Sequence, residues 1–283
     1  MTRLLAAGRA AMSVAGLRSR ARDWSDVAVL PHPVGPPTSR AALAELASGL
    51  AAGRLLGATP RLATAPRGDG HVVVDIPGWK APEITGAPLR GYLRALGYDA
   101  RGWGFGTNTG DPRRDAERVT RMVLELADDS GQPVSLVGWS LGGVIAREVA
   151  RTHPGAVRRV VTYGTPVVGG PRFTAVARAI DPKASVVAAR MAERLDAESP
   201  IQVPLTVVFS RRDGVVSWQA CIDRVSPYAD HVEVSSTHIG LGIDPDVWRI
   251  VADRLAASSD SLQPAVGRGR RAYVRALSRR MSR

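Results

Sequence analysis

Apolar and polar positions along residues 69–258 follow two periods that together predict an α/β fold. Short apolar runs predict buried strands near residues 71–76, 98–103, 133–138, 158–163, 204–210 and 231–235. Longer stretches with a helical period predict helices near residues 86–97, 112–129, 141–153, 215–225 and 245–257. Strands that alternate with helices form a mostly parallel, twisted sheet with helices on both faces.

The same pattern divides the chain into parts. We expect residues 1–68 to form a partly helical N-terminal extension, residues 69–258 an α/β domain, and residues 259–283 a basic tail. Between the fourth and fifth predicted strands, the Ala- and Arg-rich segment of about 167–203 predicts a small helical lid, and an ordinary crossover helix is the alternative. The apolar residues expected in this lid are Phe173, Val176, Ile180, Val187 and Met191.

The most specific motif of the chain follows the third predicted strand. An apolar run leads into Gly138-Trp-Ser-Leu-Gly142, and a helical pattern begins directly afterwards. A strand that turns into a helix around one residue strains the backbone of that residue, and flanking glycines remove Cβ atoms that would collide. Ser140 is then held at the positive end of a helix, which is the place of the nucleophile in a serine hydrolase. The alternative is a glycine-rich helix start that Ser140 caps.

A serine nucleophile needs a base, and the base needs a carboxylate that orients it. In this type of motif the acid and the base follow the serine in that order. His238 lies in the loop after the last predicted strand, where an imidazole can reach the serine. We expect His231, at the start of that strand, to be a surface residue, and His153 to have a structural role at the end of the helix that follows Ser140.

Asp213 is the leading candidate for the acid. It directly follows the strand predicted at 204–210, and catalytic groups gather at the carboxyl ends of strands in open parallel sheets. An Asp-Gly pair is also common in plain turns, so a turn without catalytic role is the alternative. The competing acidic residues, which we expect at surface or helix-capping positions, are Asp223, Asp230 and Asp244.

The oxyanion that forms in such a reaction needs two backbone N–H donors. The residue after the nucleophile supplies one of them, which is Leu141 in this chain. The second comes from the loop after an earlier strand, and Pro77-Gly-Trp79 is the turn that follows the first predicted strand. We therefore expect the N–H of Trp79 to be the second donor.

Taken together, these motifs resemble the α/β-hydrolase superfamily, and more narrowly bacterial lipase- and esterase-like hydrolases of the lipase class 2 kind. The resemblance covers roughly residues 70–256 and rests on Ile76–Trp79, Leu93–Tyr98, Gly102–Gly106, Asn108–Gly110, Val137–Gly143, Tyr163–Pro166, Ser210–Val216 and Thr237–Gly242. It implies that Ser140, Asp213 and His238 form a catalytic triad and that the reaction is ester hydrolysis, without naming an ester. One departure is Pro77-Gly-Trp79, where many esterases carry a His-Gly pair.

Charge is concentrated at the two ends of the chain. Residues 1–22 hold five Arg, residues 268–283 hold seven, and neither stretch has an acidic residue, so these twelve account for the net charge of +12. A helical tail would place four apolar or aromatic residues on one face, opposite most Arg, which suits peripheral contact with an anionic membrane; they are Tyr273, Val274, Leu277 and Met281. A solvated basic tail is the alternative. We expect no nucleic acid as a partner, because the folded part carries no basic motif.

Cofactor and targeting signals are sparse. There is no His/Cys spacing typical of zinc and no Gly-Lys-Ser/Thr phosphate loop, so we expect no cofactor and no metal. Cys221 is the only cysteine, which excludes an internal disulfide and favours a reducing compartment. No apolar run is long enough to span a membrane. The expected location is the cytoplasm, with the Arg-rich termini as candidate sites of peripheral membrane contact.

The sequence therefore predicts a serine carboxylic-ester hydrolase, an esterase or lipase that acts through an acyl-enzyme on a small-molecule or lipid ester. Two alternatives stay open: an acyltransferase that uses a lipid or alcohol acceptor, and an inactive hydrolase fold that binds at a membrane. Epoxide and haloalkane hydrolysis are disfavoured, because those reactions need a carboxylate where this motif has Ser140. Acyl length, alcohol partner and oligomeric state are not indicated.

Overall fold

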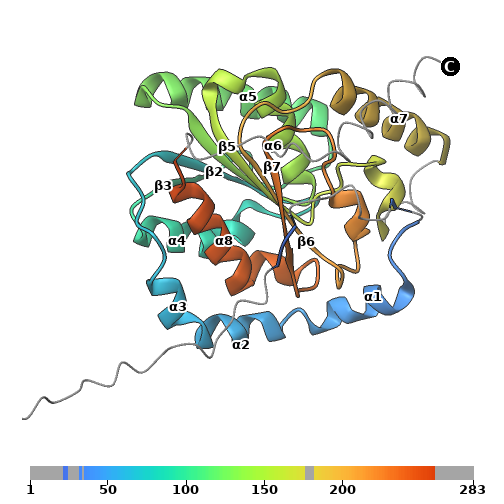
Figure 1. Ribbon diagram of the computed structural model, residues 1–283, viewed down its shortest axis with the longest axis horizontal. Helices are drawn as coiled ribbons and strands as arrows, with labels where there is room; N and C mark the ends of the chain where they lie inside the picture. The colour runs from blue at the N-terminus through green and yellow to red at the C-terminus, as the bar shows by residue number, and fades with distance from the viewer. Residues whose placement is uncertain (1–21, 25–31, 34, 176–181, 259–283) are drawn as a thin grey trace, which may run out of the picture.

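The computed structural model describes residues 22–24, 32–33, 35–175 and 182–258, and a seven-stranded sheet forms its centre (Figure 1). The strand order is β1-β7-β6-β5-β4-β2-β3; β2 to β7 are parallel, and β1 is antiparallel to β7. Their bounds are β1 (Arg22–Trp24), β2 (Val72–Ile76), β3 (Asp99–Gly102), β4 (Val134–Trp139), β5 (Val157–Tyr163), β6 (Leu205–Ser210) and β7 (Ala229–Val234). All six predicted strands form, with ends within two residues of the prediction.

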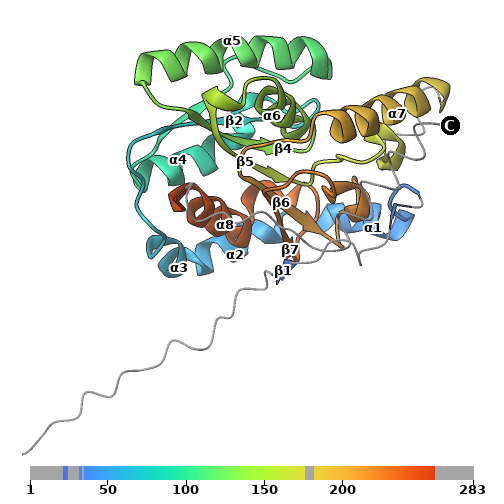
Figure 2. The ribbon, with the colours of Figure 1, turned by 45° about the horizontal axis from the view of Figure 1, so that its top comes forward.

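Helices cover both faces of this sheet (Figures 1 and 2). One face carries α5, α6 and α7, and the other carries α4 and α8 together with the N-terminal helices. The bounds are α1 (Ser39–Ala44), α2 (Leu50–Gly57), α3 (Thr59–Ala63), α4 (Ala87–Ala95), α5 (Pro112–Ser130), α6 (Leu141–Thr152), α7 (Pro182–Glu198) and α8 (Pro245–Ala256). The predicted fold class, a mostly parallel sheet between helical layers, is confirmed.

The core has two halves, because successive side chains of a strand point to opposite faces of the sheet. Val72 and Val74 of β2 belong to the cluster that α5 and α6 complete, whereas Val73 belongs to the cluster of α4 and α8. The inner strand β4 divides in the same way between Leu136 and Val137. A strand buried on both faces reads as a continuous apolar run, which is why the sequence predicts these strands well.

The prediction of a helix at residues 215–225 is wrong, because only a 3₁₀ turn, Trp218–Cys221, forms there. The backbone of residues 215–217 pairs with that of residues 173–175. The carbonyl of Ala220 accepts hydrogen bonds from the segment that follows β5. These backbone groups have partners distant in the sequence, so they do not form the ladder of an α-helix.

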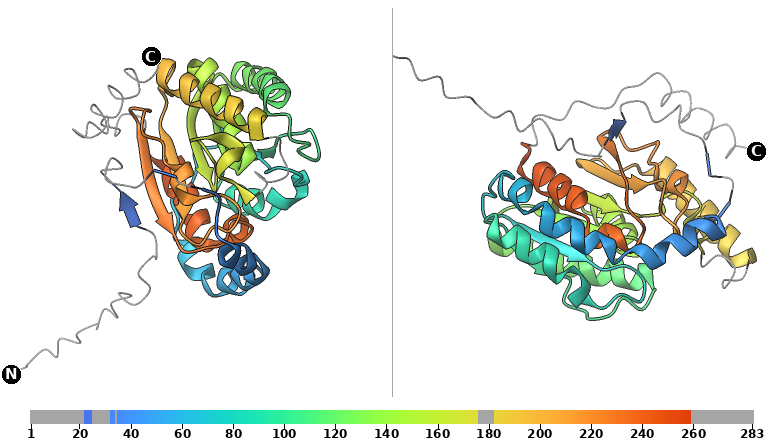
Figure 3. Two further views of the ribbon diagram at one scale, coloured as in Figure 1. Left: turned by 90° about the vertical axis from the view of Figure 1, so that its right-hand side faces the viewer. Right: turned by 90° about the horizontal axis from the view of Figure 1, so that it is seen from below.

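Three short helices, α1 to α3, precede the first parallel strand and lie along one side of the domain (Figure 3). Both α2 and α3 contact α8. Arg54 of α2 forms ion pairs with Asp244, at 2.6 Å, and with Asp246, at 3.0 Å, and Arg61 of α3 also pairs with Asp246. Ion pairs at the start of α8 thus anchor this part of the N-terminal extension.

The order of the strands reverses between β2 and β4. The chain runs from β2 outward to the edge strand β3 and then crosses back over β2 to form β4. The helix after β2, α4, covers one face of the sheet, and the helix after β4, α6, covers the other (Figure 2). In open parallel sheets such a switch point, at the carboxyl ends of the strands, is the usual place for a ligand.

Two polar residues expected at the surface are buried. His231 and Asp223 are 2% and 3% exposed, and the Nε2 atom of His231 accepts a hydrogen bond of 3.1 Å from the Asp223 N–H. The Asp223 carboxylate in turn binds Arg147 of α6 at 2.7 Å and accepts a 2.7 Å hydrogen bond from Ser226. Asp223 stays charged because Arg147 and Ser226 hold its pKa well below the ordinary value, although burial opposes this. Asp244, by contrast, caps α8 as predicted.

We predict that His231 makes stability depend on pH. Burial lowers its pKa from 6.5 to about 4. As the pH falls from about 7.5 to about 5, the unfolded chain gains a proton on this imidazole but the folded chain does not. The free energy of unfolding should therefore fall by about 2 kcal/mol from this residue. Urea unfolding of wild type and of His231→Gln at both pH values measures the effect; parallel pH dependence in the two proteins would contradict it.

Candidate active site

Ser140 lies alone between the end of β4 and the start of α6. Its backbone has φ 52° and ψ −119°, and among the described residues Lys80 is the one other non-glycine residue with a positive φ. Such a conformation costs roughly 1–3 kcal/mol and is maintained by the surrounding structure. The hydroxyl makes no capping hydrogen bond to α6. Ser140 is therefore not used as a helix cap, which was the alternative interpretation of the motif.

Glycines allow α6 to approach the sheet this closely. A Cβ atom on Gly142 would lie 2.1 Å from the carbonyl oxygen of Ile76, at the end of β2. A Cβ on Gly138 would lie 2.5 Å from the Cα of Gly143. Real Cβ atoms do not approach a backbone so closely, so both positions require glycine. The N-terminus of α6, and with it Ser140, is thereby set at the switch point between β2 and β4.

Asp213 and His238 form a buried hydrogen-bonded pair, and each residue is 4% exposed. The Nδ1 atom of His238 lies 2.7 Å from Oδ2 of Asp213. The other carboxylate oxygen accepts hydrogen bonds of 2.9 and 2.7 Å from the N–H groups of Val215 and Val216, which fix the orientation of the side chain. With Nδ1 donating to the carboxylate, Nε2 is the ring atom that can accept a proton.

The imidazole of His238 lies over the ends of β4 and β5. Its ring centroid is 5.5 Å from that of Trp139, the residue before Ser140. A Cβ atom on Gly164, directly after β5, would lie 2.9 Å from its Nδ1 atom. The residue before Gly164, Tyr163, accepts a 2.9 Å hydrogen bond from the N–H of Ser140. The Asp213–His238 pair thus packs against residues that neighbour Ser140 in the chain or bind its backbone, at the carboxyl ends of the strands.

The two residues predicted to supply oxyanion donors lie in segments that adjoin the serine. Leu141 is the first residue of α6, where backbone N–H groups have no acceptor within the helix. The turn that contains Trp79 touches the serine, because a Cβ on Gly78 would lie 3.2 Å from the Cβ of Ser140. The Trp79 side chain is 42% exposed, so any contribution to the site comes from its backbone or from contact with a bound molecule.

Asn108 is a residue of this site that sequence reasoning did not assign. It is fully buried, and its side-chain amide donates a 2.9 Å hydrogen bond to the carbonyl of Pro77. Its backbone carbonyl accepts from the N–H of Lys80 at 2.7 Å, and its own N–H donates to Ala81 at 3.1 Å. Asn108 therefore fixes the turn of Trp79 from both ends. The sequence marks Asn108 only as part of an Asn-Thr-Gly turn, and such a turn does not indicate what the asparagine side chain binds.

Ser210 is a second residue of this site to which the sequence analysis assigned no role. Its hydroxyl donates a 2.5 Å hydrogen bond to the carbonyl of Ser236 and accepts one of 3.2 Å from the Ser236 N–H. The end of β6, which leads to Asp213, is thereby joined to the loop that leads to His238.

Burial shifts the pKa of two further groups near the site. It raises the pKa of Asp75 in β2 to about 6, and the guanidinium of Arg90, at 2.8 Å, acts in the opposite direction. Burial also raises the pKa of the Cys221 thiol well above its ordinary value. A thiol that keeps its proton is a poor nucleophile, so Cys221 does not compete with Ser140 for that role.

The segment predicted as a lid contains one long helix, α7, which joins β5 to β6. Asp196 of α7 binds both Arg147, at 3.1 Å, and Arg151 of α6. Two of the predicted lid residues, Val187 and Met191, are exposed. Phe173, before the helix, is buried, while Val176 and Ile180 lie outside the described residues. That this segment acts as a lid stays a prediction.

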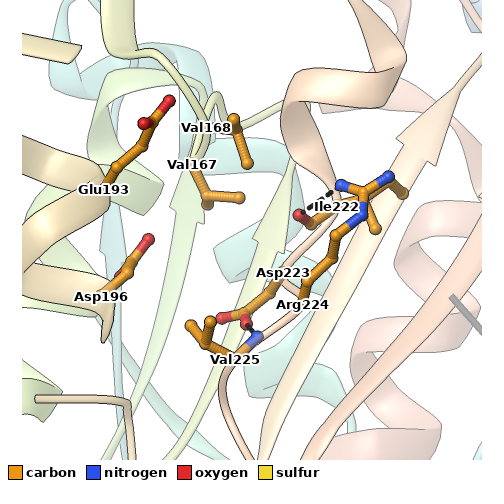
Figure 4. Close-up of a pocket in the computed structure, with 8 residues that line it drawn as sticks. All are labelled: Val167, Val168, Glu193, Asp196, Ile222, Asp223, Arg224 and Val225. Atoms are coloured by element: carbon orange, nitrogen blue, oxygen red, sulfur yellow. Dashed lines mark hydrogen bonds between the residues drawn. The ribbon is translucent and has the colours of Figure 1, made fainter. Parts of the chain in front are cut away.

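A small pocket opens between α7 and the chain before β7 (Figure 4). Figure 4 shows Glu193 and Asp196 of α7 on one wall, and Asp223 and Arg224 on the opposite wall. The two aspartates already bind Arg147, and none of the predicted site residues lines the pocket. It therefore does not identify an acyl-binding site for Ser140.

Within the described ranges, His, Cys, Asp and Glu side chains form no group of three or more that could hold a metal ion. No helix in those ranges combines the length and apolar character needed to cross a membrane. The Arg-rich termini predicted to contact a membrane lie almost entirely outside the described residues, in 1–21 and 259–283.

We predict that Gly164→Ala displaces the imidazole of His238. The added methyl group would lie 2.9 Å from Nδ1, and the residue has φ +59°, which alanine adopts only with strain. The low-field proton resonance of a His238–Asp213 hydrogen bond should be present in wild type and lost in the variant. Gly155→Ala is the matched control, because a Cβ there meets no atom within 4 Å. An unchanged resonance in Gly164→Ala would contradict the contact.

The curated relatives that match the chain cover only part of it. The pimeloyl-[acyl-carrier protein] methyl ester esterase of Citrobacter koseri is 39% identical over 72 residues, 25% of this chain and 25% of the relative. That of Aliivibrio salmonicida is 30% identical over 112 residues, 38% of this chain and 40% of the relative. The chain thus spans less than half the length of these relatives.

Solved structures match over a larger share. The thioesterase domain from the curacin biosynthetic pathway has a TM-score of 0.50 and 18% identity, covering 68% of this chain and 93% of that domain. A structure of metagenome-derived lipolytic enzymes has a TM-score of 0.52 and 14% identity, covering 67% and 93%. At such low identity these likenesses show the fold alone. The model of the alpha/beta hydrolase family matches residues 72–282, most of the chain. The resemblance expected from the motifs is confirmed: this chain belongs to the alpha/beta hydrolase family.

Proposed function

We propose that the protein is a serine carboxylic-ester hydrolase, an esterase or lipase. Ser140 is the nucleophile, His238 the general base and Asp213 the acid that orients the base. The observation that carries this proposal is the buried 2.7 Å hydrogen bond between Asp213 and His238, next to a serine held in a strained turn. A hydrogen-bonded carboxylate and imidazole beside a strand-to-helix serine is the arrangement that activates a hydroxyl.

The reaction proceeds through an acyl-enzyme. The Oγ atom of Ser140 attacks the ester carbonyl while Nε2 of His238 takes the hydroxyl proton. Asp213 keeps its hydrogen bond to Nδ1 and stabilises the imidazolium that forms. The N–H groups of Leu141 and Trp79 donate to the oxyanion. The imidazolium then protonates the leaving alcohol, and a water molecule, deprotonated by His238, attacks the acyl-enzyme and releases the acid.

Two observations support an ester with an apolar part as the substrate. The relatives that match part of the chain are named as methyl ester esterases. Exposed apolar side chains flank the reacting groups: Ile239, next to His238, is 52% exposed, and Trp79 is 42% exposed. Apolar surface beside a reactive centre is available to bind an alkyl or acyl chain.

Ser140→Ala tests the nucleophile. Hydrolysis of nitrophenyl esters of short to long chain, and of a triglyceride emulsion, should fall at least about 10⁴-fold, because no other group replaces the hydroxyl. Labelling by a fluorophosphonate probe should be lost at the same time. Ser130→Ala, at the exposed end of α5, is the control and should keep full activity and labelling.

The outcomes separate the alternatives. Undiminished labelling of Ser140→Ala would move the nucleophile to another residue, and absence of both labelling and turnover in wild type would mean that the fold is inactive. If added alcohols trap the acyl group in preference to water, the enzyme is an acyltransferase instead of a hydrolase.

A further inference from the structure

A glutamate of the N-terminal extension contacts both loops that carry the proposed acid and base. The carboxylate of Glu45 accepts hydrogen bonds on Oε1 from the N–H of Gly214, at 2.8 Å, and from the N–H of His238, at 2.7 Å. Its Oε2 atom accepts from the N–H of Ile239 at 3.0 Å. Gly214 directly follows Asp213, so one oxygen atom joins the backbone of the acid turn to that of the base.

Two further contacts seat the extension on the same loops. The hydroxyl of Ser48 lies 2.8 Å from that of Thr237, the residue before His238, within hydrogen-bond distance. On the acid side, a Cβ atom on Gly214 would lie 2.2 Å from the carbonyl oxygen of Ala41 in α1. The backbone of the extension therefore packs directly on the acid turn, and the carboxylate of Glu45 is inserted between the two loops.

We propose that Glu45 is a positioning residue for the triad. Its carboxylate holds the acid turn and the base loop in one relative position, so that Asp213 keeps its hydrogen bond to His238 and the imidazole stays next to Ser140. This inference rests on the proposed function, because it assigns Glu45 a part in that reaction without contact with substrate.

The contacts explain why a carboxylate is suited to this place. Three backbone N–H groups from two loops converge on it, and a carboxylate offers acceptor sites on both oxygens and no donor. Hydrogen bonds to a charged acceptor are about twice as strong as neutral ones. Displacement of a catalytic group by about 1 Å can lower the rate about 10²-fold, so a small shift of one loop relative to the other should slow the chemical step.

Other residues anchor the extension, so the role of Glu45 can be separated from simple docking. The side chain of Arg61 forms an ion pair with Asp246 at the start of α8, on neither of the two loops. Loss of that ion pair should loosen the extension and lower stability, while the three N–H groups keep their acceptor. Arg61→Gln is therefore the matched control for Glu45→Ala.

Ester hydrolysis per titrated active site tests the proposal. In Glu45→Ala, kcat should fall about 10²-fold while KM changes less than about threefold, because substrate contacts are intact. Glu45→Gln, which keeps one acceptor oxygen, should retain an intermediate kcat and serves if Glu45→Ala does not fold. Arg61→Gln should keep the wild-type kcat. A wild-type kcat in Glu45→Ala, or an equal fall in Arg61→Gln, would overturn the proposal.

Hydrogen exchange provides a readout that does not depend on activity. The amides of Gly214, His238 and Ile239 should be protected in wild type and exchange at least about tenfold faster in Glu45→Ala, with no change in Arg61→Gln. Unchanged exchange at all three amides would overturn the proposal that Glu45 holds the two loops together. Absence of ester turnover in the wild-type protein would refute the proposed reaction. If the three amides still lose protection in Glu45→Ala, the result would support the role of Glu45 in holding the two loops together.

Discussion

The close contact between the N-terminus of α6 and the end of β2 is the constraint on which the rest of the structure depends. Gly142 lies directly against the carbonyl of Ile76, and no side chain separates helix from strand. Because β2 and β4 are neighbours at the switch point, this contact also decides where the chain can turn between β4 and α6. The turn has room for one residue, Ser140, in a conformation that is unfavourable in an isolated chain.

Hydrogen bonds around the serine maintain this strained conformation. The Ser140 N–H is held by Tyr163 of β5, and the turn after β2 is held by the buried amide of Asn108. On the opposite side, Glu45 and Ser210 join the loops that carry Asp213 and His238. The proposed catalytic residues lie in turns and loops, but each of these is tied to a strand or to a neighbouring loop by buried hydrogen bonds.

Much of this arrangement is predictable from the sequence, because it depends on local patterns. Strands buried on both faces appear as apolar runs, and the glycines around Ser140 mark the sharp turn. Asp213 and His238 follow predicted strands, and the structure has them at the ends of β6 and β7. Parallel strands bring their carboxyl ends to one edge, so knowing the strands is enough to bring these residues together.

The rest could not be predicted, because it depends on partners that are far apart in the sequence. Glu45 lies in an Ala- and Leu-rich stretch and resembles any solvated glutamate, while its partners lie 169 to 194 residues later. Asp223 is buried because Arg147, 76 residues earlier, supplies the opposite charge. Nothing in the local pattern around residues 215–225 indicates that this backbone pairs with the segment before α7.

The short strand β1 has a consequence for how the protein behaves at high concentration. Its three residues pair with Glu233, Val232 and His231, along what would otherwise be the open edge of β7. An uncovered apolar edge strand is a template for pairing with a second molecule. Because β1 occupies this edge and is itself only three residues long, little open edge is left at this border of the sheet for a second molecule to pair with.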